Sequence, residues 1–427
     1  MEILFSLSIA LFAGLMLSRL AKLVKLPAVT AYLVAGILVG PFCLGAFKVS
    51  GLGFTSMANI KSFSLVSDVA LGFIAFSIGN EFRLSQLKTI GKQATVIGIL
   101  QAVITTLLVD LALITLHFII PETLSLEAAI VLGAVASATA PAATLMVVRQ
   151  YKSKGPVTDT LLPVVALDDA VGLVLFSISF GIAKALIAGH VSIVSIIVEP
   201  LIEVLLSIGL GAGMGYLFTF FERFFHSRSK RLSMSVAFVF LTVAISMLDF
   251  KIGGEDGVHV AFSPLLTCMM LGTIFCNICD FSEELMDRLD RWTAPIFILF
   301  FVLSGAELDL TVLTDIMIVL VGVVYIVFRC LGKYFGARAS ATLVKSDENI
   351  RKYLGITLFP QAGVALGMAI KAAALGATGV IVANITLFSV LIYELVGPFL
   401  TKVALDKAGE IDHGGKVSAR LKESANN

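Results

Sequence analysis

Long apolar segments separated by short polar connections dominate the chain. We read thirteen of them, at residues 3–18, 27–42, 62–79, 93–119, 126–148, 161–187, 193–221, 232–249, 259–277, 293–306, 312–334, 353–371 and 378–401. About 20 apolar residues in a helix span a bilayer. Helices are favoured over a barrel, because a barrel would show short alternating strands. The pattern predicts an all-α polytopic membrane protein with about 13 transmembrane helices, covering residues 1–401, and a polar cytoplasmic tail at 402–427.

The composition agrees with this class. Hydrophobic residues make up 58% of the 427 residues and charged residues 14%, whereas a soluble domain carries roughly 25% charge. This excludes a soluble enzyme, a nucleic-acid-binding protein and a disordered chain. The 31 basic and 30 acidic residues nearly cancel, so the net charge indicates no polyanionic partner. The expected surroundings are the lipid bilayer.

The basic residues are unevenly distributed between the connections. Those after odd-numbered segments, together with the tail, carry 24 Lys and Arg, and the others carry five. The positive-inside rule then predicts a multi-pass cell-membrane protein with its N-terminus outside and its C-terminus in the cytoplasm.

An internal repeat is visible at an offset of 226 residues. Residues 74–84 (IAFSIGNEFRL) and 300–310 (FFVLSGAELDL) share a Gly-x-Glu-apolar-charged-Leu pattern and lie seven segments apart. An odd separation turns the second copy upside down, so we expect an inverted-topology repeat of the kind found in secondary transporters.

Two adjacent carboxylates, Asp168 and Asp169, interrupt the apolar segment 161–187. One charged side chain costs about 2.5–3.5 kcal/mol on membrane-insertion scales. Adjacent helix positions point about 100° apart, so one carboxylate can face a water-filled cavity and the other a neighbouring helix. Repulsion and burial both favour neutralisation by a proton or a metal cation. The alternative is a neutralised, hydrogen-bonded pair with a structural role.

Basic side chains also occur within the apolar segment 312–334. Arg329 lies deep in it, and Lys333 follows one turn later. Either can compensate the charge of an aspartate, and we favour Arg329 for this intramembrane role. An alternative for Lys333 is that its side chain extends to the cytoplasmic surface.

Mid-membrane prolines predict two broken helices. Pro141 follows Thr139 and Ala140, and Pro360 precedes Gln361 and Gly363. Proline removes a backbone hydrogen bond, and a broken helix offers carbonyls to cations and N–H groups to anions. A simple kink is the alternative at either position alone. The two breaks are again seven segments apart, so we expect two crossing discontinuous helices.

Four alternating glycines mark the segment 193–221: Gly209, Gly211, Gly213 and Gly215. Spacings of four produce two faces of small residues, which suit close helix packing. Packing within the protomer and packing across a dimer remain equally open.

Six motifs together resemble the monovalent cation:proton antiporter-2 family, which includes the Kef-type and Na⁺/H⁺ antiporters, over residues 3–401. They are FSIGNEFRL (76–84), SATAPAATLMVV (137–148), VALDDAVGLVLF (165–176), FRCLGKYFGAR (328–338), FPQAGVALGMAI (359–370) and YELVGP (393–398).

This resemblance implies a homodimer with a scaffold, expected at about 3–42 and 193–277, beside a core, expected at about 62–187 and 293–401. It also implies that Asp169 binds the shared Na⁺ or K⁺ and the proton, with Asp168 beside it. We add Thr139 and Ala140 to this site.

Three departures from the family pattern concern the ligands. The resemblance places Arg329 where electrogenic members have a lysine paired with the first aspartate, with Lys333 as a reserve. Ala140 stands where one branch has an aspartate, and Gln361 and Gly363 stand where relatives carry Arg and Glu. Selectivity and stoichiometry therefore stay open.

We predict a secondary transporter that exchanges Na⁺ and/or K⁺ for protons by alternating access, serves pH homeostasis, is not an enzyme and needs no cofactor. The alternatives are a sodium-coupled organic-anion symporter on the same fold and a channel-like cation pathway. An intramembrane aspartyl protease is excluded, because such a protease carries its two aspartates on separate helices, whereas Asp168 and Asp169 are adjacent.

Overall fold

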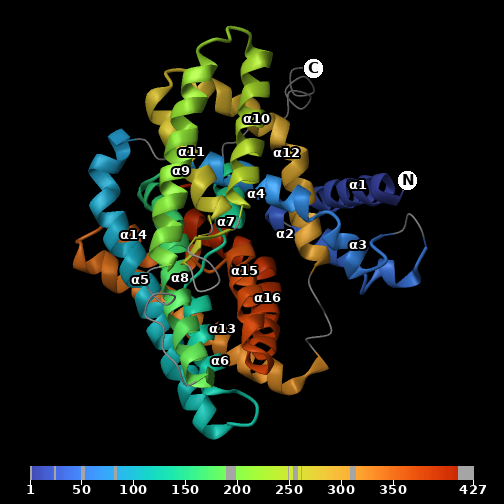
Figure 1. The fold of residues 1–427 in the computed structure, drawn as a ribbon, viewed down its shortest axis with the longest axis vertical. Helices are drawn as coiled ribbons and strands as arrows, with labels where there is room; N and C mark the ends of the chain where they lie inside the picture. Colours follow the sequence, from blue (N-terminus) through green and yellow to red (C-terminus); the bar gives the residue numbers. More distant parts are fainter. Residues whose placement is uncertain are drawn as a thin grey trace.

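The computed structural model describes residues 2–23, 26–49, 53–80, 84–188, 199–248, 250–252, 258–260, 262–307 and 314–411. Helices make up almost all of this part of the chain (Figure 1). Two three-residue strands, β1 (Phe250–Ile252) and β2 (Val258–Val260), form an antiparallel pair. The predicted all-α class is confirmed.

Over its described residues, each of the thirteen predicted apolar segments corresponds to one helix or to a pair of half-helices, except that the segment 259–277 begins in β2. The helices are α1 (Glu2–Leu23), α2 (Ala28–Val39), α3 (Met57–Lys61), α4 (Ser64–Asn80), α5 (Leu84–Ile119), α6 (Leu126–Val135), α7 (Pro141–Gln150), α8 (Pro156–Ala188), α9 (Glu199–Glu222), α10 (Arg228–Ser246), α11 (Pro264–Ile278), α12 (Ser282–Ala306), α13 (Ile316–Leu343), α14 (Glu348–Thr357), α15 (Gly363–Ala372) and α16 (Ala377–Lys407), with 3₁₀ turns η1 (Leu44–Phe47) and η4 (Ala373–Leu375). Within the described residues, nine helices are long and apolar enough to cross a membrane, and α4, α6 and α11 are shorter apolar helices.

Several helices extend beyond the apolar segments that predict them. The largest extension is at α12, which begins at Ser282 although its apolar segment begins at residue 293. Its first turns carry Glu283, Glu284 and other charged residues. Backbone hydrogen bonding continues through polar residues, whereas hydropathy detects only the part suited to hydrocarbon.

The helices pack in two groups. Helices α5–α8 and α13–α16 contact one another, and this group is called the core below; α1, α2, α4 and α9–α12 contact one another, and this group is called the scaffold. The prediction had placed the segments 62–79 and 293–306 in the core. The corresponding helices α4 and α12 contact chiefly α11 and α2, and the predicted division into core and scaffold stays a prediction. Sequence order does not reveal these contacts, because both helices connect directly to core helices.

The same order of helices occurs twice along the chain: α4, α5, the pair α6 and α7, and α8 are followed later by α12, α13, the pair α14 and α15, and α16. The second helices of the two series, α5 and α13, pack closely against each other. This order is what the 226-residue offset predicts, and the inversion of the two copies stays a prediction.

Candidate functional site

Two helix breaks meet in the core. The first separates α6 from α7 at residues 136–140, and the second separates α14 from α15 at 358–362. Each break bonds to the other: the Ala140 N–H donates to the Pro360 carbonyl at 2.8 Å, and Gln361 Nε2 donates to the Val135 carbonyl at 2.9 Å. Pro141 opens α7 and Gly363 opens α15. The proline-marked segments are therefore broken helices that cross, not kinked ones.

The side chain of Gln361 also stabilises the crossing of the two broken helices. Its side chain is fully buried. Besides Val135, its Nε2 lies 2.9 Å from the Tyr325 hydroxyl, and its Oε1 accepts from Ser389 Oγ at 3.3 Å. These contacts join α13 and α16 to both breaks. The residue thus acts as a structural bridge at the crossing.

Arg329, on α13, is fully buried and lies against the carbonyls of both breaks. Its Nε donates to Ala136 O at 2.9 Å, its Nη2 to Ala138 O at 2.7 Å and its Nη1 to Phe359 O at 2.7 Å. The guanidinium also lies 4.4 Å from the centre of the Tyr393 ring. These carbonyls follow the C-terminal ends of half-helices, where the helix dipole favours a cation.

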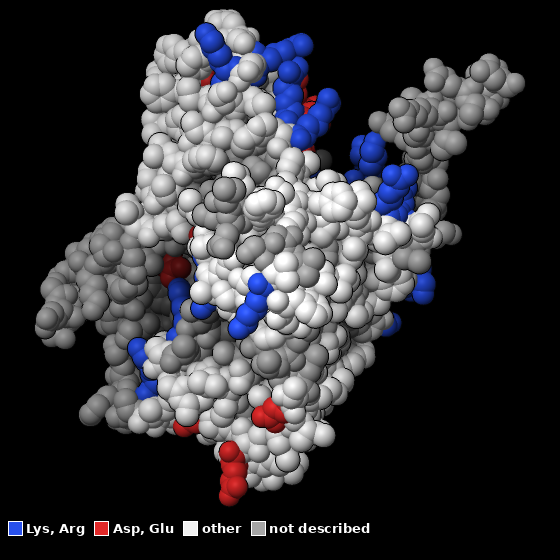
Figure 2. Space-filling view, turned by 90° about the vertical axis from the view of Figure 1, so that its right-hand side faces the viewer, with Lys and Arg blue, Asp and Glu red and all other residues white. Residues whose placement is uncertain are grey.

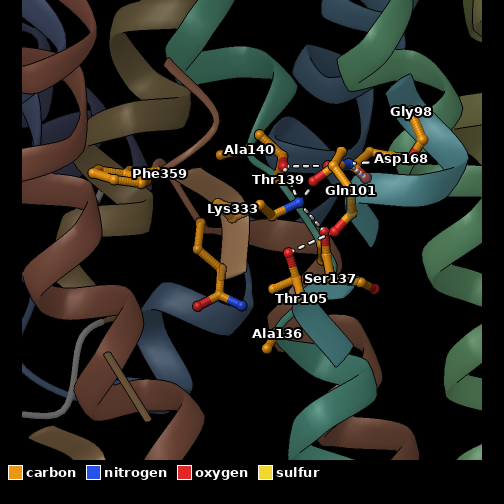
Figure 3. A network of polar contacts seen from close by, with 12 residues as sticks. Gly98, Gln101, Thr105, Ala136, Ser137, Thr139, Ala140, Asp168, Lys333 and Phe359 are labelled. Carbon is orange, nitrogen blue, oxygen red and sulfur yellow. Dashed lines mark hydrogen bonds and ion pairs between the residues drawn. The ribbon is translucent and has the colours of Figure 1, made fainter. Parts of the chain in front are cut away.

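Lys333 is the basic residue that pairs with an aspartate. Its Nζ lies 2.6 Å from Asp168 Oδ2 and 3.0 Å from Thr139 Oγ1, and it also donates to the Ser137 carbonyl (Figure 3). Both Lys333 and Asp168 are fully buried. The expectation that Arg329 occupies the lysine position is therefore corrected, and so is the alternative that Lys333 extends to the surface. The two residues are one turn apart on the same helix, so the sequence alone does not determine which one reaches Asp168.

Asp168 accepts hydrogen bonds from two further side chains. Thr139 Oγ1 donates to its Oδ2 and Gln101 Nε2 donates to its Oδ1 (Figure 3). Its oxygens are thus met from α5, from the first helix break and from α13. Gln101 was missed from the sequence. The sequence feature that could have revealed it is an amide within the apolar segment 93–119, where a buried polar side chain needs a hydrogen-bond partner.

The remaining predicted ligands are placed as follows. Ala140 contributes its backbone, and its carbonyl accepts from Thr144 Oγ1 at 3.1 Å. The backbone of Asp169 belongs to α8, but its side chain lies outside the described part of the chain. The structure thus brings Asp168, Thr139 and Lys333 together, with Arg329, Pro360 and Gln361 at the adjoining crossing.

A cleft of about 980 Å³ opens between the core and the scaffold. Residues of α7 and α8 line it on the core side, among them Leu145 and Leu162. On the other side lie residues of α2 and α12, among them Tyr32 and Phe297. Because α7 begins at the first break and α8 carries Asp168, the cleft runs beside both elements of the site.

Comparisons with known proteins identify the family and agree with the fold. A family model described as sodium/hydrogen exchanger, transmembrane, matches residues 7–407. The sodium proton antiporter MjNhaP1 from Methanocaldococcus jannaschii at pH 8 is similar in structure, with a TM-score of 0.66 and 20% identity, over 96% of this chain and 100% of that one. An electron-microscopy structure of the same antiporter has a TM-score of 0.73 and 16% identity, over 95% of this chain and 97% of that one. No curated protein matches the chain in sequence.

Proposed function

Since this chain belongs to the transmembrane sodium/hydrogen exchanger family, it is a transporter and not an enzyme, and we propose that it exchanges Na⁺ or K⁺ for protons at Asp168 and Asp169. Family membership favours cation/proton antiport over an organic-anion symporter or a channel-like pathway. The narrower antiporter-2 group stays a prediction from the motifs.

The observation that carries this proposal is the buried ion pair of Asp168 and Lys333 beside two crossing broken helices. A membrane protein keeps such charges in its interior chiefly for transport or coupling. In the proposed mechanism a proton or a cation neutralises Asp169, and only the neutralised site crosses the low-dielectric barrier at low cost. Competition at one carboxylate then couples the two gradients.

Alternating access is the proposed route, with the core moving against the scaffold. The cleft between these groups supports it, because it offers water a path beside α7 and α8. We further propose that the cleft faces the cytoplasm and that the N-terminus lies outside. In Figure 2, many Lys and Arg gather at the upper end of the face shown, with a few acidic side chains among them, and the lowermost charged side chains are acidic. The positive-inside rule assigns the basic end to the cytoplasm.

Dye-monitored proton exchange in proteoliposomes tests this function. We expect a cation gradient of Na⁺ or K⁺ to drive proton movement across the membrane. Testing Na⁺, K⁺ and Li⁺ in turn identifies the preferred ion. Proton movement that is independent of all three cations would overturn the proposal.

We propose that exchange is electrogenic, because a lysine holds the position beside Asp168. Lysine can release its proton, whereas an arginine guanidinium stays protonated. An extra titratable group allows more protons than cations to move in each cycle. In Lys333→Arg, which keeps the charge, we expect the dependence of the exchange rate on an imposed membrane potential to disappear.

Arg338→Lys, at an exposed position of the same helix, is the control for this variant and is expected to keep the wild-type dependence. An undiminished response to membrane potential in Lys333→Arg would contradict electrogenic coupling through this residue.

A homodimer is proposed through one face of α9. A Cβ on Gly211 would lie 2.3 Å from the Thr267 carbonyl, and one on Gly215 would lie 2.7 Å from Ile274 Cβ, so this face packs on α11. Gly209 and Gly213 have nothing within 4 Å of a Cβ, so the other small-residue face is open. In a bilayer such faces allow close approach of a second helix.

Substituting leucine on the two glycine faces of α9 is expected to have different effects on dimerisation and stability. Gly213→Leu is expected to separate the protomers while keeping the melting temperature, as measured by light scattering and thermal unfolding in detergent. Gly211→Leu is expected to lower the melting temperature, because its side chain meets backbone. A dimer that survives Gly213→Leu would rule out this face.

A further inference from the structure

The boundary between the core and the scaffold is largely apolar. Leu145 of α7 and Leu162 of α8 belong to the same buried cluster as Phe73 of α4 and Phe297 of α12. Apolar contacts are non-directional and can be exchanged as surfaces slide. Polar contacts across such a boundary fix the relative position of the two groups, because they need a short distance and a defined angle.

Two polar contacts join the end of α7 to the scaffold. Arg149 Nη1 lies 2.6 Å from Asp290 Oδ1 of α12. The next residue, Gln150, accepts a hydrogen bond through Oε1 from the Ala28 N–H of α2 at 2.8 Å. All four residues line the cleft or form its wall. Another ion pair across the boundary, Lys371 with Glu203, is longer at 3.8 Å and lies outside the cleft.

Helix α7 connects these contacts to the ion site. It has ten residues, from Pro141 at the first break to Gln150, which is about 15 Å of helix. A short helix transmits displacement as a rigid unit. The C-terminal end of α7 contacts the scaffold through Arg149 and Gln150, and its N-terminal end adjoins the break that contacts Pro360.

We propose that Arg149 and Asp290 form an ionic latch that holds the cleft-open position of the core and must open in each transport cycle. The inference rests on the proposed alternating access. It adds a specific pair that sets the balance between conformers. Displacement of the core by several ångströms breaks a 2.6 Å contact, so the two conformers differ by this ion pair.

The solvent exposure of Arg149 and Asp290 sets how strongly their ion pair can shift the balance between conformers. The side chains are 23% and 34% exposed, so water weakens their attraction, and pairs of this kind shift an equilibrium by up to about five-fold. A latch of this strength biases the conformers without trapping one of them, as turnover requires.

The test measures the ratio of conformers directly. Spin labels at Lys230→Cys of the scaffold and Lys345→Cys of the core, both exposed positions, report the separation of the groups in the full chain by pulsed electron resonance. We expect Arg149→Glu and Asp290→Arg each to lower the cleft-open to cleft-closed ratio about two- to five-fold. The double charge swap is expected to restore it.

Arg288→Glu is the matched control. Arg288 pairs with Glu284 at 2.9 Å within α12, so the same charge change crosses no boundary. An unchanged ratio in both single variants, or a double swap that fails to restore it, overturns the latch. The distance measurement needs no ion flux. A chain that failed to exchange cations would therefore refute the proposed function and still test the latch.

Discussion

Asp169→Asn is expected to abolish cation-driven proton exchange. Asparagine is neutral at every pH, so it can neither take up a proton nor attract a cation by charge. With a permanently neutral residue at the site, competition between the two ions is lost. Dye-monitored proton movement in proteoliposomes should fall to the level of empty liposomes for every cation tested.

Asp347→Asn makes the same chemical change outside the site. Asp347 caps α14 by accepting from the Asn349 N–H at 2.8 Å, and asparagine caps helices equally well. This control should exchange at the wild-type rate. Normal exchange by Asp169→Asn, in protein that is folded and inserted, would refute the assigned role of that carboxylate.

Arg329→Gln is expected to lower the stability of the protein more than any other single substitution considered above. The guanidinium donates to three carbonyls that belong to two broken helices. A shorter neutral amide cannot reach all three, and each buried carbonyl left without a donor costs about 1–3 kcal/mol. We expect a loss of about 3 kcal/mol or more, seen as a large fall in the melting temperature in detergent.

Arg338→Gln, on the exposed surface of the same helix, controls for the loss of an arginine from α13. It should leave the melting temperature within about 2 °C of wild type, because surface substitutions usually change stability by less than 0.5 kcal/mol. Equal melting temperatures for the two variants would show that Arg329 does not hold the crossing.

Hydropathy and a few special residues were enough to predict the elements. Each apolar segment became a helix or a pair of half-helices, because a long apolar run has few alternatives in a membrane. Pro141 and Pro360 marked the two breaks, because proline cannot donate the backbone hydrogen bond that continues a helix. Both effects are local, so no knowledge of neighbouring helices was needed.

The partners of the buried charges were decided by the tertiary structure. Arg329 and Lys333 lie four positions apart on one face of α13 and both carry long basic side chains, so the sequence leaves open which one pairs with Asp168. The packing of α13 on α5 puts the ammonium of Lys333 on the carboxylate and the guanidinium of Arg329 on the broken helices. Gln101 joined the site in the same way, from a helix with no other mark of function.

The sequence by itself therefore determined the membrane class, the helices, the two breaks and the aspartate pair. The tertiary structure decided which basic side chain pairs with Asp168 and which binds the helix breaks, and which helices pack together. Hydrophobicity and backbone chemistry act on neighbouring residues along the chain. Ion pairs and hydrogen bonds need their atoms within about 3 Å, and residues more than 150 positions apart reach that distance only when the helices pack.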